Sequence, residues 1–217
     1  MKTLTIEKNL DLCFLIDLTP ALNPENRKYW LKLINILFVH LYKMAYRARV
    51  MVHLYCGKEW FALSDQFEYL DEPPLWTDED FDIMDLSLAS SPIDSLHALA
   101  FCLNQCRKAE MQDLFSSSSL QIFWISADAS TDAEARDIAA IRHADVSVSA
   151  YCLSPEDSFV KSLSDCTENA PRVFEENMES SLYCFAAVRD EIESVLYAYE
   201  HHPGMMAGHT GISVPLS

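Results

Sequence analysis

The sequence predicts an α/β fold, a three-layer α/β/α sandwich built on a mainly parallel central sheet. Short apolar runs typical of buried strands alternate along the chain with longer segments of helical periodicity. Such alternation implies right-handed crossovers and parallel strand pairing. The chain has 217 residues and is 50% hydrophobic, which is enough for one domain with a substantial core.

The first half of the chain opens with a buried strand and a long helix. Residues 10–17 form the predicted strand: 10–16 are apolar except for Asp11, as expected inside a sheet, and Asp17 ends the run. Residues 25–47 repeat apolar side chains with a helical period, and Pro24 suits a first helical turn. The apolar arc of this helix is wider than one buried face requires, so two neighbours bury it or part of it awaits a partner. A second strand at 49–55 follows, and 58–63 is its hairpin or edge partner.

The second half of the chain alternates helices and strands more regularly. Pro92 marks the start of a predicted helix at 91–111, and the nearly unbroken apolar run 120–126 predicts a strand buried on both faces. We expect a domain spanning 1–200 and a flexible tail at 201–217, which has no periodicity. The remaining elements are helix 131–144, strand 145–153, short helix 154–169, strand 171–176 and helix 179–200.

Charge and hydropathy limit the classes of partner. The chain carries 33 acidic and 16 basic residues, a formal net charge of −17, which disfavours direct binding to nucleic acid or to an anionic membrane. The opening residues are too polar for a signal peptide, and no apolar run approaches the roughly 18 residues of a membrane span. We therefore expect protein partners.

The seven cysteines predict reduced thiols in an intracellular protein of the nucleus or cytoplasm. Their number is odd and no CxxC occurs, so a paired-cysteine zinc motif is absent from the sequence. Cys102 and Cys106 lie one helical turn apart and could supply two metal ligands, but no second pair stands beside them.

Enzymatic activity is not expected. Gly57 is the only glycine among the first 203 residues, which excludes glycine-rich nucleotide-binding loops. No G-x-S-x-G nucleophile elbow occurs, and the paired acidic residues lie in a charged loop without an apolar pocket. The sequence therefore favours a binding protein without a catalytic site.

Two surfaces are candidates for binding a partner. Residues 64–94 form an acidic excursion with scattered aromatic residues, which is either a solvated loop or a docking segment. The wide apolar arc of helix 25–47 is the other. The candidate contact residues are Trp30, Phe38 and Tyr42 on the helix and Trp76 and Phe81 in the acidic segment.

The order of elements, with Asp-x-Thr after the first strand in "FLIDLTPALNP", resembles a von Willebrand factor A (vWA) domain over roughly residues 8–200. In that family an Asp-x-Ser-x-Ser motif, a threonine and a later aspartate hold Mg²⁺ and leave one position for a partner's carboxylate. The resemblance places Asp17 and Thr19 at the first two motif positions and Ala21 at the third.

The other metal positions depart further from the family pattern. Ile93, with Asp94 beside it, falls where the threonine is expected, and Ala127, followed by Asp128, falls at the later aspartate. The resemblance thus implies a vestigial site made of Asp17, Thr19, Asp94 and Asp128, without a metal or other cofactor. Asp17 would then stabilise a loop or face a helix. The alternative is a metal-dependent binding module that keeps a variant Mg²⁺ site through the same four residues.

Within the vWA family, "FLIDLTPALNP", "INILFVHLYKMAYRARVMVHLY" and "VSVSAYCLSPEDSFVKSLSDCTENAPRVFEE" resemble the smaller vWA subunit of TFIIH, a factor of transcription and DNA repair. That resemblance implies a non-catalytic scaffold in a multi-subunit nuclear complex. A second resemblance, through "EWFALSDQF", is to the adaptor of BRCA1-A/BRISC-type deubiquitinase assemblies. Both imply that the chain works by binding other proteins.

Overall fold

The computed structural model describes residues 9–44, 48–57, 59–63, 66–82, 95–112, 118–127, 135–142, 146–155, 157–167, 169–175 and 177–201. Strands within these ranges are β1 (Asn9–Asp17), β2 (Arg49–Cys56), β3 (Glu59–Ala62), β4 (Ser118–Ala127), β5 (Ser147–Leu153) and β6 (Arg172–Phe174). They form one sheet in the order β3-β2-β1-β4-β5-β6. All neighbours pair in parallel except β2 and β3, which are antiparallel.

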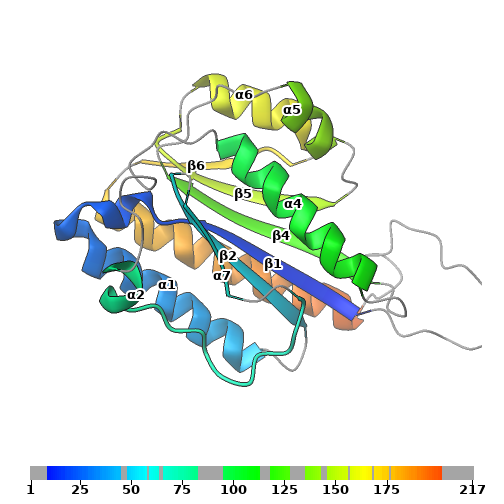
Figure 1. Cartoon of the computed structure of the whole chain (residues 1–217), viewed down its shortest axis with the longest axis horizontal. Helices are drawn as coiled ribbons and strands as arrows, with labels where there is room; N and C mark the ends of the chain where they lie inside the picture. The colour runs from blue at the N-terminus through cyan, green and yellow to red at the C-terminus, as the bar shows by residue number, and fades with distance from the viewer. Residues whose placement is uncertain are drawn as a thin grey trace, which may run out of the picture.

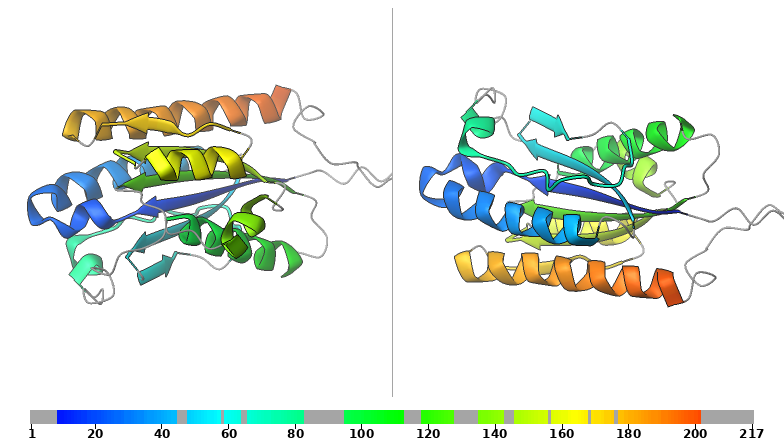
Figure 2. Two further views of the ribbon diagram at one scale, coloured as in Figure 1. Left: turned by 90° about the horizontal axis from the view of Figure 1, so that it is seen from above. Right: turned by 90° about the horizontal axis from the view of Figure 1, so that it is seen from below.

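Helices cover both faces of this sheet, as Figures 1 and 2 show. One face carries α1 (Pro24–Met44) and α7 (Met178–His201), and the other carries α4 (Ser95–Gln112), α5 (Ala135–Arg142) and α6 (Asp157–Cys166). A 3₁₀ turn, η1 (Thr19–Leu22), links β1 to α1, and a short helix, α2 (Asp78–Asp82), lies in the acidic segment. The predicted α/β/α sandwich with a mainly parallel sheet is confirmed.

Alternation along the central strand divides the core into two halves. Leu12 and Phe14 of β1 point toward α1 and α7, where Phe14 stacks on Phe123 of β4 at 5.2 Å between ring centroids. Cys13 and Leu15 point toward α4. Because β1 and β4 are buried on both faces, their sequences are almost continuously apolar.

The long helix α1 is buried on two sides, which explains its wide apolar arc. It packs between the sheet and α7, where the indole of Trp30 meets Phe185 edge-on at 5.2 Å. The predicted helix 25–47 ends at Met44 within the described residues. The tail from residue 202 lies outside them.

A buried ion pair fixes the register where β1 and β2 begin. Asp11, the one acid inside the apolar run, accepts hydrogen bonds from Arg49 Nε to Oδ1 and from Arg49 Nη2 to Oδ2, both at 2.8 Å. The two residues are direct register partners across the strands. A bidentate pair of this kind satisfies a carboxylate that would otherwise be buried at high cost.

Part of the acidic segment packs on the domain. Glu68 forms an antiparallel bridge to Val50 of β2, and the Phe67 side chain is buried near α4. Residues 66–77 then run beside α1 to α2 (Figure 1). Residues 83–94, the rest of the predicted excursion, lie outside the described residues.

The two edges of the sheet are short, since β3 has four residues and β6 three. None of the described helices is long and apolar enough to cross a membrane.

Candidate functional site

Asp17 ends β1 at the carboxyl edge of the sheet and is only 1% exposed. Its Oδ1 accepts the amide N–H of Thr19 at 2.8 Å, and its Oδ2 accepts the amide N–H of Ala127, at the end of β4, at 3.1 Å. Its backbone oxygen accepts the indole N–H of Trp30 at 2.9 Å. One aspartate therefore ties together the ends of two strands, the 3₁₀ turn and α1.

Burial raises the pKa of Asp17 from its ordinary value of 3.8 to about 6, although hydrogen bonds from Thr19, Ala127 and Tyr55 oppose the rise. Tyr55 belongs to a second buried chain of hydrogen bonds beside the carboxyl. Its hydroxyl donates to Ser126 Oγ and accepts from Trp124 Nε1, each at 3.2 Å. Burial and the Asp17 charge raise the pKa of Tyr55, so this phenol stays protonated.

Two of the four predicted metal-site positions come together here. Asp17 and Thr19 are adjacent, whereas Asp94 and Asp128 lie outside the described residues. Both Asp17 oxygens already accept an amide N–H, and Ala127 contributes only backbone at the position where the vWA pattern has an acid. Magnesium needs near-octahedral oxygen coordination. The described donors alone do not fit that requirement.

Most of the predicted partner-binding aromatics lie in the core. Trp30 and Phe38 are buried between the sheet and α7, and Trp76 is 7% exposed and packs edge-on against Phe61 at 5.6 Å. Trp30 and Phe38 therefore offer almost no surface to a docking protein, and Trp76 contributes only a small exposed part to a surface groove. Tyr42 is 40% exposed, and the Phe81 side chain lies outside the described part of the chain.

A groove of about 710 Å³ lies beside these aromatics, between α1, the segment leading into α2, and α7. Ile36 lines it with 55% of its side chain exposed. Among the residues that the structure describes, four basic residues and one acidic residue, Asp78, line the groove. The basic lining residues are Lys28, Lys32, Lys43 and Arg189, and the apolar ones are Leu31, Ile36, Val39 and Trp76.

Asn35 forms the wall of this groove by clamping the acidic segment to α1. Its Nδ2 donates to the Trp76 carbonyl at 2.7 Å, and its Oδ1 accepts the Trp76 amide N–H at 2.8 Å. Arg189 is partly neutralised by Asp190, 2.7 Å away. The lysines of α1 are therefore the main source of positive charge in the groove.

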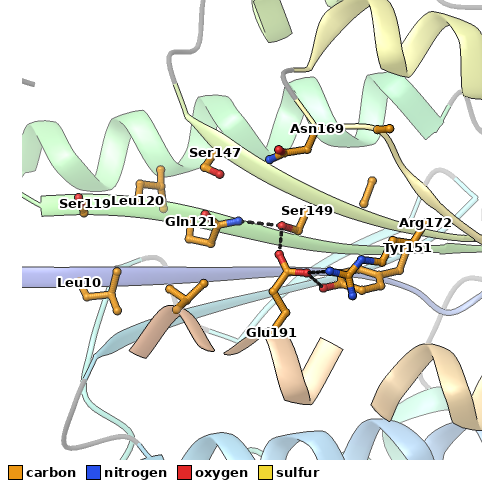
Figure 3. A pocket seen from close by; sticks show the side chains of 13 residues that line it. Leu10, Ser119, Leu120, Gln121, Ser147, Ser149, Tyr151, Asn169, Arg172 and Glu191 are labelled. Carbon is orange, nitrogen blue, oxygen red and sulfur yellow. Dashed lines mark hydrogen bonds and ion pairs between the residues drawn. The ribbon is translucent and has the colours of Figure 1, made fainter. Parts of the chain in front are cut away.

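A second cavity, of about 520 Å³, opens between β4, β5 and α7 and is shown in Figure 3. Glu191 of α7 reaches the sheet at its floor, where Oε1 accepts from Ser149 Oγ and Oε2 accepts from the Tyr151 hydroxyl at 2.6 Å. Arg172 Nη2 of β6 lies 2.8 Å from the same Oε2.

The polar groups of this second cavity bond to one another. Gln121 Nε2 donates to Ser149 Oγ at 3.0 Å, which extends the network across β4. Burial and the hydrogen bond to Glu191 raise the pKa of Tyr151, so the phenol keeps its proton and remains a donor. Because both Glu191 oxygens are engaged by the protein itself, the network fixes α7 to the sheet.

Sequence reasoning named this helix as a binding surface for its apolar arc but did not connect its lysines with a groove. The signal was present in the spacing of the lysines: Lys28, Lys32 and Lys43 project to one side of the predicted helix. The arginine on α7 carried no such signal, since its position depends on helix packing.

No family model and no curated protein matches the sequence. The similarity to solved structures lies in the fold. Proximal thread matrix protein 1 from the mussel byssus aligns with a TM-score of 0.55 and 11% identity, covering 85% of this chain and 48% of that one. The chain thus spans about half the length of that protein.

The vWA domain of SpRpn10 aligns with a TM-score of 0.51 and 8% identity, covering 81% of this chain and 94% of that domain. At such low identities the likeness establishes the architecture and nothing finer. The chain has a vWA-like α/β fold.

Proposed function

We propose that the protein is a non-catalytic vWA-like scaffold that binds other proteins as a subunit of a larger complex. The vWA-like fold suggests an interaction module. In support of a role without catalysis, Asp17 is buried beneath its own hydrogen bonds and Glu191 is committed to holding α7.

The observation that carries this proposal is the groove on α1. The chain as a whole has a net charge of −17, yet the described lining of this groove has four basic residues and one acidic residue. Ile36 and Val39 add apolar surface to the same lining. Positive charge collected around exposed apolar surface, in an otherwise acidic protein, favours a ligand that is both acidic and apolar.

The occupant that fits is an amphipathic acidic segment of a partner protein. Its apolar side chains would cover Ile36, and its carboxylates would pair with Lys28, Lys32 and Lys43. The rest of the acidic surface would repel the same segment, so charge would direct it to this groove. Rim charges of this kind act mainly on the rate of association and on its salt dependence.

The test is affinity purification from native extract with the wild-type chain and with a Lys32→Glu/Ile36→Asp variant. Both side chains are exposed, so the variant should fold. We expect it to lose the partners that the wild-type chain retains, as quantified by mass spectrometry. Unchanged capture would refute the groove as the docking surface.

A matched control changes the opposite face in the same way. Lys161→Glu on α6 and Met111→Asp on α4 combine one charge reversal with one apolar-to-acid change at exposed positions. This control should capture the same partners as the wild-type chain. If both variants lose them equally, the effect comes from added negative charge and not from the groove.

The identity of the captured proteins tests the finer form of the proposal, a TFIIH-like role in transcription and DNA repair in the nucleus. It is supported by the resemblance of "FLIDLTPALNP" and the other segments to the smaller vWA subunit of that factor. Recovery of TFIIH subunits would support it, and recovery of deubiquitinase subunits would support the adaptor role instead. A chain that purifies alone as a monomer would contradict both.

A metal-dependent binding module is the second candidate, favoured by the adjacency of Asp17 and Thr19 at the end of β1. Titration with Mg²⁺ or Mn²⁺ separates it from the scaffold. The scaffold proposal expects no saturable rise in melting temperature. A rise that Asp17→Ala abolishes would favour the metal-dependent module.

A further inference from the structure

Three buried cysteines from two distant parts of the chain converge inside the core between β1 and α4. Cys13 lies on β1, and Cys102 and Cys106 lie on α4, one helical turn apart. Their sulfur atoms all lie within 4.8 Å of one another, and the Cys13 and Cys102 sulfurs are 3.5 Å apart. All three side chains are fully buried.

This spacing is that of a thiolate metal site. Zinc binds cysteine sulfur at about 2.3 Å, so two sulfurs of a tetrahedral site are about 3.8 Å apart. The Cys13–Cys102 separation of 3.5 Å is close to that value, and the other two separations do not exceed 4.8 Å. A disulfide would use only two of them and would leave the third without a role.

The neighbouring strand carries a candidate for the fourth ligand, His53. Met51 of β2 is the register partner of Cys13, and His53 is the partner of Leu15, so both point toward α4. The His53 nitrogens are not among the ligand atoms that lie within 4.8 Å of one another, so the imidazole would have to turn toward the three sulfurs to complete the site. His53 Nε2 is 3.0 Å from Met51 Sδ, and metal binding would exchange that contact for a bond to the ion.

We propose that Cys13, Cys102, Cys106 and His53 form a structural site for a thiophilic divalent cation, with Zn²⁺ as the ion that fits best. Three cysteines and one histidine are a common ligand set of closed, structural zinc sites. The ion would join the first strand of the sheet to the helix that covers it. Such a site is loaded as the chain folds, and its binding energy contributes to folding.

Protons must leave when the cation binds. Cysteine ligates a metal as the thiolate, so binding of Zn²⁺ releases the protons of the ligating thiols to solvent. Loading should therefore weaken as the pH falls.

The first test is the metal content of the full chain, purified under reducing conditions without a histidine tag and analysed by elemental mass spectrometry. We expect one zinc per chain. Refolding with Co²⁺ in place of Zn²⁺ should give the thiolate-to-cobalt charge-transfer band and the visible bands of a tetrahedral site. A chain without stoichiometric metal and without these bands would overturn the proposal.

The matched variants are Cys106→Ser and Cys184→Ser. Each replaces a fully buried thiol by a hydroxyl, but Cys184 lies on α7 in the other half of the core. Cys106→Ser should reduce bound metal to background and remove the cobalt bands, while Cys184→Ser should keep both. If Cys106→Ser does not fold, the metal content and cobalt spectrum of the wild-type chain still decide.

Thermal denaturation with and without a strong zinc chelator gives an independent reading. The melting temperature of the wild-type chain should fall when the ion is removed and recover when Zn²⁺ is added. Both changes should be larger than those measured for Cys106→Ser. Identical melting in all conditions would overturn the proposal. So would an intact mass that shows a Cys13–Cys102 disulfide in the native chain.

Discussion

At the residue scale, Asp17 shows how an acid at a strand end can serve a structural purpose. It connects η1, α1 and the end of β4 through hydrogen bonds that need its oxygens but not its charge. Its raised pKa has a direct consequence for stability. A carboxyl that binds its proton more tightly in the folded state stabilises the fold at low pH and loses that contribution as the pH rises.

The expected pH window follows from the two pKa values. In the unfolded chain Asp17 titrates near 3.8, and in the folded protein near 6. Its contribution to the free energy of unfolding should therefore fall as the pH rises between these values, by a total on the order of 3 kcal/mol.

Asp17→Asn should remove this dependence. Between about pH 4.5 and about pH 7, the wild-type protein should lose about 2 kcal/mol more unfolding free energy than the variant, as measured by urea denaturation. The asparagine will also change the hydrogen bonds at every pH, so the difference between the two slopes is the result that matters. Parallel pH profiles would show that Asp17 does not titrate in this window.

At the element scale, the acidic segment and α1 form one unit. Trp76 supplies an apolar anchor, and Asn35 supplies two hydrogen bonds to the backbone of the segment. Changing Trp76 to serine would therefore remove a core side chain, and the loss of about 3–5 kcal/mol expected for such a truncation would obscure any effect on docking. Asn35 is the better position at which to release the segment.

Asn35→Ala should destabilise the protein by about 1–3 kcal/mol, because the two polar backbone atoms of Trp76 lose their partners. Limited proteolysis should also cut within residues 66–77 faster in the variant. Asn26→Ala, at an exposed position in the first turn of α1, is the matched control and should change neither quantity. Equal cleavage of all three proteins would mean that packing of Trp76 alone holds the segment.

At the scale of the whole molecule, stability should be graded outward from the centre of the sheet. β1 pairs with β2 and β4 along most of its length and is covered on both faces, whereas β3 and β6 are short and each has one neighbour. Amides in β1 and β4 should therefore exchange with solvent only upon global unfolding, and those of β3 and β6 through local opening.

Hydrogen exchange followed by mass spectrometry measures this gradient. Peptides from β1 and β4 should be the slowest to exchange, with free energies of opening that approach the unfolding free energy from denaturation. Peptides from β6 should exchange many times faster. Equal protection in all strands would mean that the sheet opens only as a unit.

The fold was largely predictable from the sequence, because strand and helix patterns are local. The apolar run 120–126 predicted a buried strand, and the helical period of 25–47 predicted a helix, each without reference to the rest of the chain. Side-chain position depends instead on which elements meet. Trp30 is covered by Phe185, which lies 155 positions later in the chain, so its burial could not be predicted from the helix alone.

The candidate sites were less predictable for the same reason. Cys102 and Cys106 were visible as a pair one turn apart, but the third sulfur comes from Cys13, 89 positions away from Cys102. Only the packing of α4 on β1 brings them together. Likewise, the spacing of the lysines on α1 was readable, whereas the contribution of Arg189 required the placement of α7.

The short edges of the sheet bear on how this protein behaves when it is crowded among other chains. Outward-facing backbone at the rim is what allows separate sheets to fuse and grow into fibrils. Here the edge strand β6 has three residues and the edge strand β3 has four. A second copy that added its own strand to such an edge would form few backbone hydrogen bonds. Polymerisation through the backbone is therefore disfavoured, and contacts between molecules depend on side chains.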